Sequence, residues 1–244
     1  MSRQRAAKAQ KRMMQVDNTV SFNQAPKASP RPVHLVPRTR NQERLVLALS
    51  DTNADIVVTV GPAGTGKTYL AMQAAVRALR EGQCDRIVLT RPAVGVEDER
   101  HGFLPGNLVA KMEPWTRPLL DVLREYYRPQ DIVSMIEEQV VEIAPLAFMR
   151  GRSLKNTIII ADEMQNATPN QMKMLMTRIG QNSRIVITGD VEQTDRKKDN
   201  NGLLDLITRL QKGGVEGIVL CEFTVRDIQR HAIIGKVLKL YEDL

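Results

Sequence analysis

The residues best suited to chemistry form one short stretch near position 60. The stretch reads Gly61-Pro62-Ala63-Gly64-Thr65-Gly66-Lys67-Thr68, which is the G-x-x-x-x-G-K-T pattern of a P-loop. The glycines allow backbone N–H groups to surround phosphate oxygens, and a helix that starts here adds a favourable dipole. Lys67 can reach the β- and γ-phosphates of a nucleotide, and the Thr68 hydroxyl can ligate Mg²⁺. The apolar run 56–60 before the stretch and the helical composition after it are the context in which such a loop binds phosphate.

Three more polar side chains follow apolar runs further along the chain. Asp162 can hold Mg²⁺ through water beside Thr68, and Glu163 can polarise a water for in-line attack on the γ-phosphate. Gln193 follows the next apolar run, where an amide can contact both the γ-phosphate and the attacking water. A small-molecule kinase must exclude water, so the acid pair favours hydrolysis of a nucleotide over phosphoryl transfer to a metabolite.

A positive charge at the γ-phosphate usually completes a site of this type, often as an arginine from a neighbouring subunit. Three arginines are candidates. Arg178 lies on a predicted helix over 169–180, whereas Arg226 and Arg230 are four residues apart on a predicted last helix over 225–241 and share one of its faces. Surface ion pairing is the alternative role for each. The three histidines are scattered without ligand spacing, which argues against a metal site or a histidine-based triad.

The elements that must position these groups alternate along the chain. Strands are predicted over 56–60, 86–90, 140–143, 156–161, 183–188 and 217–223. Helices are predicted over 41–50, 69–80, 107–111, 115–127, 131–138, 169–180, 201–210 and 225–241. Fully apolar strands alternating with helices predict an α/β fold, with a mostly parallel central sheet and helices on both faces. Ligands of such sheets bind at the carboxyl ends of the strands, where all the polar motifs of this chain are found.

Charge is spread unevenly over the 244 residues. Residues 1–40 hold nine Lys or Arg and one acid, a charge of +8, while the other 204 residues carry −1. Four prolines also interrupt the first 40 residues, which predicts a disordered basic arm, followed by one domain over 41–244. The arm either touches nucleic-acid phosphates or is a solvated tail. The near-neutral domain argues against a broad basic DNA-binding surface.

Composition excludes several other classes of protein. No apolar run approaches the 18 or so residues of a membrane span, and the basic N-terminus lacks the apolar core of a secretory signal. Cys84 and Cys221 form neither a metal-ligand spacing nor a disulfide framework. These features predict a cytoplasmic protein without a membrane partner.

Segments in a fixed order resemble the PhoH-like family of cytoplasmic P-loop ATPases. They are 61–68 (GPAGTGKT), 90–93 (TRPA), 102–106 (GFLPG), 145–153 (PLAFMRGRS), 162–166 (DEMQN), 171–174 (QMKM), 177–180 (TRIG), and 189–190 (GD) with Gln193. The first and fifth segments are generic, but the ordered set is specific, and the similarity runs from about 41 to about 239. Two departures are Met164, where the family has a small residue, and Arg196 in a basic run, where it has an apolar one.

This resemblance implies a RecA-like ATPase domain over 41–244, related to superfamily 1 helicases, with ATP and Mg²⁺ as ligands. In related helicases a glutamine before the P-loop strand reads adenine, and Gln42 stands at the similar place. The segment with Asp227, Arg230 and His231 is similar to a family motif near the C-terminus. Family members are linked to unwinding of RNA or DNA and to ring-shaped oligomers, such as hexamers. Because the chain encodes one RecA-like half, a cleft between halves needs a second subunit.

Two functions remain open from the sequence. The first is an oligomeric, helicase-like ATPase that acts on RNA or single-stranded DNA, supported by the motif set, the basic arm and the aromatic stretch around Trp115. The alternative is a nucleotide-dependent switch or assembly ATPase that acts on a protein, which the near-neutral domain allows. A small-molecule kinase is the least favoured interpretation.

Overall fold

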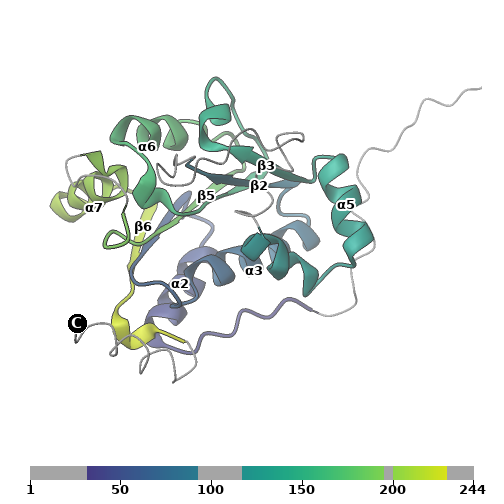
Figure 1. Cartoon of the computed structure of the whole chain (residues 1–244), viewed down its shortest axis with the longest axis horizontal. Coiled ribbons are helices and arrows are strands. Elements are labelled where there is room, and N and C mark those ends of the chain that lie inside the picture. The colour runs from purple at the N-terminus through teal and green to yellow at the C-terminus, as the bar shows by residue number, and fades with distance from the viewer. Residues whose placement is uncertain (1–31, 93–116, 195–199, 230–244) are drawn as a thin grey trace, which may run out of the picture.

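The computed structural model of the protein describes residues 32–92, 117–194 and 200–229 (Figure 1). Several features predicted from the sequence lie outside these residues. They are most of the basic arm, the helix over 107–111, Trp115, the basic run 196–198, and Arg230 with His231.

Six parallel strands form one sheet at the centre of the fold. They are β1 (Ile56–Val60), β2 (Arg86–Arg91), β3 (Val141–Pro145), β4 (Thr157–Ala161), β5 (Arg184–Gly189) and β6 (Ile218–Glu222). Their order is β3-β2-β4-β5-β1-β6, and every neighbouring pair is parallel. All five residues of β1 are buried, which explains why its sequence is apolar without alternation. The predicted α/β fold with a central parallel sheet is confirmed.

Helices cover both faces of the sheet (Figure 1). On one face, α2 (Arg40–Ser50), α3 (Lys67–Arg80), the helical residues 117–124 and α5 (Pro129–Glu137) share a hydrophobic core with Val57 and Leu89. On the other face, α6 (Pro169–Met176) and α7 (Gly202–Lys212) pack against Val58 and Ile187. The two cores hold the strand ends in fixed positions, so the loops at the carboxyl edge have a rigid base.

Most helix ends follow local signals in the sequence. The Thr39 hydroxyl accepts a hydrogen bond from the backbone N–H of Gln42 (3.3 Å) and caps α2. Thr168 and Gln171 form a reciprocal capping box at the start of α6. Gly82, with φ +69°, follows the end of α3, as expected of a left-handed C-terminal residue.

The helix predicted over 169–180 is shorter in the structure. It ends at Met176, because Leu154 forms a parallel β-bridge with Ile179 and draws the chain into an extended path. The backbone N–H of Leu154 donates to the carbonyl of Arg178 (3.0 Å), and the N–H of Gly180 donates back to the Leu154 carbonyl (2.7 Å). Arg178 therefore lies beyond the helix and not on it.

The last predicted helix is wrong over its described start. Val225–Asp227 forms only a 3₁₀ turn, η4, and Ile228 is extended with φ −64° and ψ 120°. The reason is a tertiary contact: the backbone N–H of Gln229 donates to the carbonyl of Gly64 in the P-loop (2.8 Å). Arg226 therefore does not lie on a regular α-helix, and the predicted shared helix face with Arg230 reaches outside the described residues.

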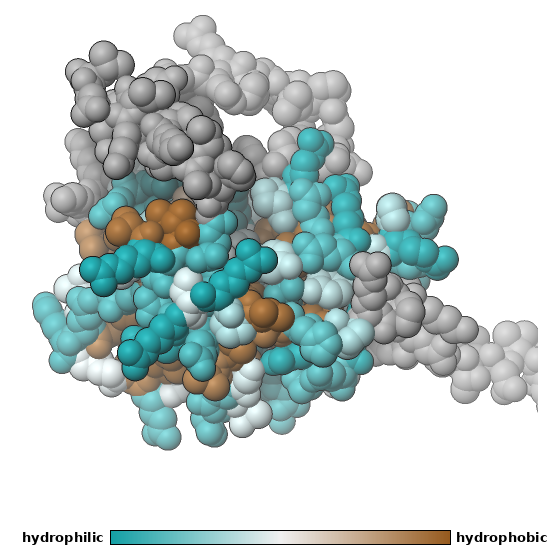
Figure 2. Space-filling view, turned by 90° about the horizontal axis from the view of Figure 1, so that it is seen from below, coloured by the Kyte–Doolittle hydropathy of each residue, from teal (hydrophilic) through white to brown (hydrophobic). Residues whose placement is uncertain are grey.

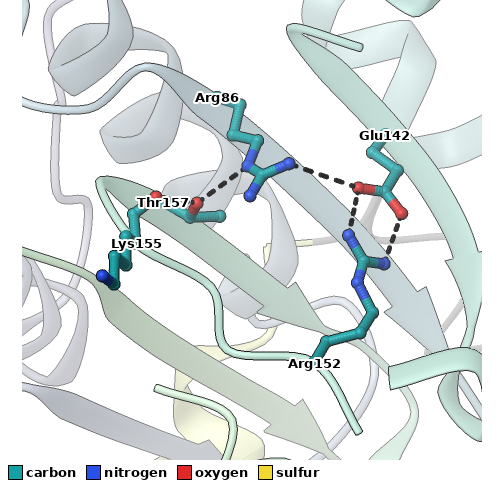
Figure 3. Close-up of polar contacts among 5 residues, drawn as sticks. All are labelled: Arg86, Glu142, Arg152, Lys155 and Thr157. Carbon is teal, nitrogen blue, oxygen red and sulfur yellow. Dashed lines mark hydrogen bonds and ion pairs between the residues drawn. The ribbon is translucent and has the colours of Figure 1, made fainter. Parts of the chain in front are cut away.

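A cluster of charged and polar side chains lies over the strands near the β3 edge of the sheet (Figure 3). Arg152 donates two hydrogen bonds to Glu142 of β3 (2.5 and 2.7 Å). Arg86 of β2 lies 4.0 Å from the same carboxylate and donates to the Thr157 hydroxyl (3.0 Å). The cluster fastens the return from β3 to β4 across the sheet, which gives it a structural role.

Figure 2 shows a face that is mostly hydrophilic, with hydrophobic patches scattered over it. Within the described ranges, no helix has both the length and the apolar character needed to cross a bilayer.

Candidate functional site

The P-loop forms the turn from β1 into α3. Gly61, Gly64 and Gly66 have φ values of +134°, +79° and +83°. Residues with a side chain rarely adopt such angles, so the three glycines give the loop its shape. The Lys67 ammonium lies inside the loop, where it donates to the carbonyls of Gly61 (2.7 Å) and Pro62 (2.8 Å). A buried, inward-facing lysine at a helix N-terminus is suited to bind phosphate oxygens.

The proposed magnesium ligands lie side by side. The Thr68 hydroxyl donates to Oδ1 of Asp162 (2.8 Å), and the Thr188 hydroxyl donates to the same oxygen. Asp162 is buried at the end of β4, and Thr68 lies in the first turn of α3. One strand, β5, lies between β4 and the P-loop strand β1. A hydroxyl and a carboxylate at this spacing fit Mg²⁺, which takes few protein ligands and completes its shell with phosphates and water. Within the described ranges, no group of three or more His, Cys, Asp or Glu offers an all-protein metal cage.

Glu163 follows Asp162 in a left-handed conformation, with φ 54° and ψ 39°. Its carboxylate accepts a hydrogen bond from Nε2 of Gln165 (2.5 Å) and lies 3.9 Å from Nη2 of Arg91, at the end of β2. The side chain of Glu163 is 38% exposed, so water can reach it. The geometry leaves a carboxylate that is oriented and still open to solvent.

Gln193 lies on the loop after β5. Its backbone N–H donates to the carbonyl of Asp190 (3.1 Å), and the N–H of Glu192 donates to Oδ1 of Asp190 (3.1 Å). These bonds form a tight turn that carries the exposed Gln193 beside Glu163. The structure thus brings both side chains to one site, as the sequence predicts.

One cavity of about 300 Å³ joins these groups. It is lined by Ala63, Gly64, Gly66, Lys67 and Thr68 of the P-loop, by Asp162 and Glu163, by Thr188 to Asp190, and by Gln193. Its outer wall is formed by Tyr69, Pro118 and Val122. A larger cavity of about 1110 Å³ opens at the amino edge of the sheet, but its lining includes neither the P-loop nor Asp162, Glu163 or Gln193, so the smaller cavity is the candidate site.

Tyr69 connects the cavity wall to the rest of the molecule. Its hydroxyl donates to Glu125 (2.9 Å) and accepts from Nε2 of Gln73 (3.0 Å), which also donates to the Tyr126 hydroxyl (2.6 Å). Burial, together with the hydrogen bond and charge of Glu125, raises the pKa of Tyr69 to about 12. The phenol is therefore neutral at physiological pH, and it fixes α3 against the segment after residues 117–124.

Gln42 is hydrogen-bonded to the backbone of the P-loop. It is 4% exposed, its Nε2 donates to the carbonyl of Thr65 (2.9 Å), and its Oε1 accepts from the backbone N–H of Arg38 (2.7 Å). Both ends of the amide are thus engaged within the protein, and Gln42 is not among the residues that line the cavity. Reading of adenine by Gln42 stays a prediction, and the observed contacts hold the loop in shape.

The two candidate arginines that the structure describes, Arg178 and Arg226, do not line the cavity. Arg178 lies at the amino edge of the sheet, where its guanidinium donates to the carbonyls of Met174 (3.1 Å) and Arg152 (3.2 Å). Arg226 is exposed on η4. Arg91, which the sequence did not single out as catalytic, is the described arginine paired with Glu163.

Sequence reasoning also missed two buried residues near the site. Gln165 bonds to Glu163, and Asp227 accepts hydrogen bonds from Asn41 (2.8 Å) and the backbone N–H of Thr224 (2.9 Å). Gln165 belongs to the 162–166 segment and Asp227 to the C-terminal motif, but the sequence suggests no role for either side chain. Their roles depend on contacts between distant parts of the chain.

Comparison with solved structures gives distant likenesses. A Pif1 helicase from Candida albicans aligns with a TM-score of 0.39 and 14% identity, over 84% of this chain and 44% of that one. Domain III of the replication initiation protein DnaA from Thermotoga maritima aligns with a TM-score of 0.35 and 15% identity, over 86% and 73%. Both scores lie below 0.5, so neither likeness carries a functional argument.

Sequence relatives are much closer. PhoH-like proteins of Synechocystis and Bacillus subtilis are 42% and 43% identical over 205 residues, which is 84% of this chain and 61% and 63% of theirs. Protein PhoH of Escherichia coli is 36% identical, over 83% of this chain and 57% of its own length. The chain thus spans about three fifths of the relatives' length. The family model for PhoH-like proteins matches residues 34–242. With its P-loop, acid pair and parallel sheet, the chain belongs to the PhoH-like protein family.

Proposed function

We propose that the protein is a cytoplasmic, Mg²⁺-dependent ATPase that works as an oligomer on RNA or single-stranded DNA. One observation carries the proposal: a single cavity joins the P-loop, the Thr68–Asp162 pair and the solvent-accessible carboxylate of Glu163. Phosphate binding, metal binding and water activation are the three tasks of nucleotide hydrolysis, and each has its residue here.

The residues divide these tasks by position. The backbone N–H groups of the P-loop and the Lys67 ammonium bind the β- and γ-phosphates. Thr68 and Asp162 orient Mg²⁺, which when bound neutralises charge on the phosphate oxygens. Glu163 orients a water for in-line attack and accepts its proton, while Gln193 contacts the γ-phosphate from the next strand end. Release of phosphate then changes the contacts of the Gln193 loop.

A polynucleotide partner is supported by charge and by one exposed aromatic residue. The N-terminal arm carries a charge of +8, against −1 for the rest of the chain. Within the domain, Phe148 is 57% exposed in the 3₁₀ turn η1 (Leu146–Met149), and the exposed Arg150 is the first residue after this turn. These residues come after β3, at the carboxyl edge that also holds the cavity. Aromatic stacking on bases with arginine contacts to phosphates is how sequence-independent binders hold single strands.

An oligomer is supported by the position of the arginines. Within the described residues, Arg178 is turned to carbonyls of its own chain at the edge opposite the cavity. A second copy that places an arginine over Glu163 would complete the site, and a closed ring of copies repeats that contact without unpaired ends. Arg178, Arg226 and Arg230 remain the candidates.

The alternative is a nucleotide-dependent switch or assembly ATPase acting on a protein. It is favoured by the near-neutral charge of residues 41–244, which differs from the basic surface of most nucleic-acid-binding domains. It expects stimulation of ATP hydrolysis by a protein and none by any polynucleotide.

ATP hydrolysis measured with and without RNA, single-stranded DNA and duplex DNA, alongside mass in solution, tests the proposal. We expect hydrolysis that requires Mg²⁺ and rises with single strands. Lys67→Ala should abolish it, and Glu163→Gln should keep ATP binding but block turnover. Normal turnover in Glu163→Gln would remove Glu163 as the water-activating residue, and no salt-sensitive binding of single strands would favour the protein-directed alternative.

A further inference from the structure

The side chain of Gln165 contacts three different residues beside the site. It lies in the short turn η2 (Met164–Asn166) and is only 1% exposed. Its Nε2 donates to Oε2 of Glu163 (2.5 Å) and to the carbonyl of Gln193 (3.2 Å). Its Oε1 accepts from the backbone N–H of Asp190 (3.1 Å). One amide therefore joins the end of β4 to the loop after β5.

The backbone around Gln165 strengthens this bridge. The carbonyl of Gln165 accepts from the Thr194 hydroxyl (3.2 Å), which adds another contact to the same loop. Gly189, the last residue of β5, has no side chain, and a Cβ there would meet Oε1 of Gln165 at 2.8 Å and its backbone nitrogen at 3.2 Å. The end of β5 thus leaves the space that the amide occupies.

We propose that Gln165 is a positioning residue that holds Glu163 and the Gln193 loop in one fixed arrangement. The inference rests on the proposed function, because it assumes that Glu163 orients water and Gln193 contacts the γ-phosphate. A change at the γ-phosphate that moves the loop is then passed to the carboxylate through a single buried amide. Gln165 does not line the cavity and acts only through its two partners.

The chemistry of the bridge requires a glutamine. The side chain must donate to a carboxylate and a carbonyl and accept from an N–H, and an amide does all three. A glutamate keeps the acceptor for Asp190 but places a second carboxylate against Glu163. A methionine keeps the length and the packing but removes every hydrogen bond, which leaves the buried N–H of Asp190 without its partner.

The test compares Gln165→Met and Gln165→Glu with wild type in steady-state hydrolysis of Mg·ATP. We expect kcat to fall about 100-fold in both, because a misplaced base loses most of its catalytic contribution. The Kd for a fluorescent ATP analogue should change less than about 3-fold, since the P-loop and the Thr68–Asp162 pair are untouched. A fall in kcat of less than about 3-fold, or an equal weakening of Kd, would overturn the proposal.

Gln171→Met is the matched control. Gln171 is a partly buried glutamine in the first turn of α6, where its Oε1 accepts from the backbone N–H of Thr168 (2.9 Å), and it does not line the cavity. It should lower the urea midpoint about as much as Gln165→Met while leaving kcat at the wild-type value. If its kcat falls as far, general loss of stability explains both effects and the proposal fails.

A double variant gives a second, independent measurement if Gln165→Met folds poorly. In single-turnover hydrolysis with labelled ATP, the double variant Glu163→Gln with Gln165→Glu should lose less rate than the product of the two single losses, because part of the effect of Gln165 passes through Glu163. Single losses that multiply in the double variant would contradict the proposal. Failure of the proposed function looks different: wild type itself would not hydrolyse ATP, or Glu163→Gln would turn over normally.

Discussion

At the scale of single residues, the conformation of Glu163 explains how two neighbouring acids serve one cavity. Successive side chains of a strand point to opposite faces of the sheet, so Asp162 and Glu163 would separate if β4 continued. The left-handed φ of 54° at Glu163 ends the strand and turns both carboxylates toward the cavity. This conformation costs a non-glycine residue about 1 kcal/mol, which the bonds through Gln165 offset.

Gly61 should be intolerant of any side chain. Its φ is +134°, and an added Cβ would lie 2.4 Å from the carbonyl oxygen of Phe223, so both the backbone and the space forbid it. We expect Gly61→Ala to lower the free energy of unfolding by about 3 kcal/mol and to weaken ATP binding. Gly82→Ala is the control, because its φ is +69° but nothing lies within 4 Å, and it should cost about 1 kcal/mol. Equal losses in urea unfolding would contradict this account.

At the scale of elements, local patterns predicted what depends on local chemistry. The limits of β1 follow from its apolar run, and α2 begins after Thr39, a residue type that favours helix starts. The position of β5 between β1 and β4 could not be predicted, because chain order does not give spatial order. Nor could the early end of α6, since its cause, Leu154, lies more than twenty residues away. The bridge made by Gln165 was missed for the same reason.

The contact between η4 and α2 should make stability depend on pH. Burial alone would raise the pKa of Asp227, but hydrogen bonds from the Thr39 hydroxyl, the Thr224 N–H and Asn41 outweigh it and lower the pKa. A lowered folded pKa gives stability that is present above the unfolded pKa and lost as pH falls through the folded value. The free energy of unfolding of wild type should therefore exceed that of Asp227→Asn at neutral pH, and this difference should shrink below about pH 4.

Urea unfolding of both proteins between pH 3 and pH 7 measures this difference. Asp205→Asn is a suitable control, because Asp205 is paired with Arg209 on the exposed face of α7 and should contribute less than about 1 kcal/mol. If the advantage over Asp227→Asn is as large at pH 3 as at pH 7, the charged form of Asp227 does not hold η4 to α2.

The turn η1 should carry part of the affinity for single strands. Base stacking contributes about 1–3 kcal/mol per aromatic residue, so Phe148→Ala should weaken binding of single-stranded RNA or DNA about 10-fold, and Arg150→Ala should reduce its salt dependence. Hydrolysis without polynucleotide should not change. Val133→Ala on α5 is the matched control, since Val133 is 55% exposed but has no basic neighbour in sequence. Equal weakening by Val133→Ala in fluorescence anisotropy would remove η1 as the contact.

At the scale of the whole molecule, the boundary between arm and domain decides which truncation is informative. Residues 41–244 were predicted as the domain, but Val33 and Leu35 pack against the hydrophobic core beside α2. The Thr39 hydroxyl caps α2, and the N–H of Arg38 donates to Gln42 under the P-loop. Removal of residues 1–40 would remove both these stabilising interactions and the basic charge. Weaker binding of nucleic acid could then come from lost stability or from lost charge.

Deletion of residues 1–31 separates the effect of the basic charge from the effect of the stabilising contacts. This segment holds seven Lys or Arg and one acid, and its deletion keeps Val33, Leu35, Arg38 and Thr39 in the chain. If the arm binds phosphates, its removal should lower affinity for single strands and flatten the dependence of log K on log salt, by about 0.7 for each phosphate that the arm neutralises. Hydrolysis of ATP without polynucleotide and the urea midpoint should stay at wild-type values. Deletion of residues 1–40 should lower stability by at least the ~1 kcal/mol that the Thr39 cap contributes. An unchanged salt slope after deletion of 1–31 would place all nucleic-acid binding on the domain.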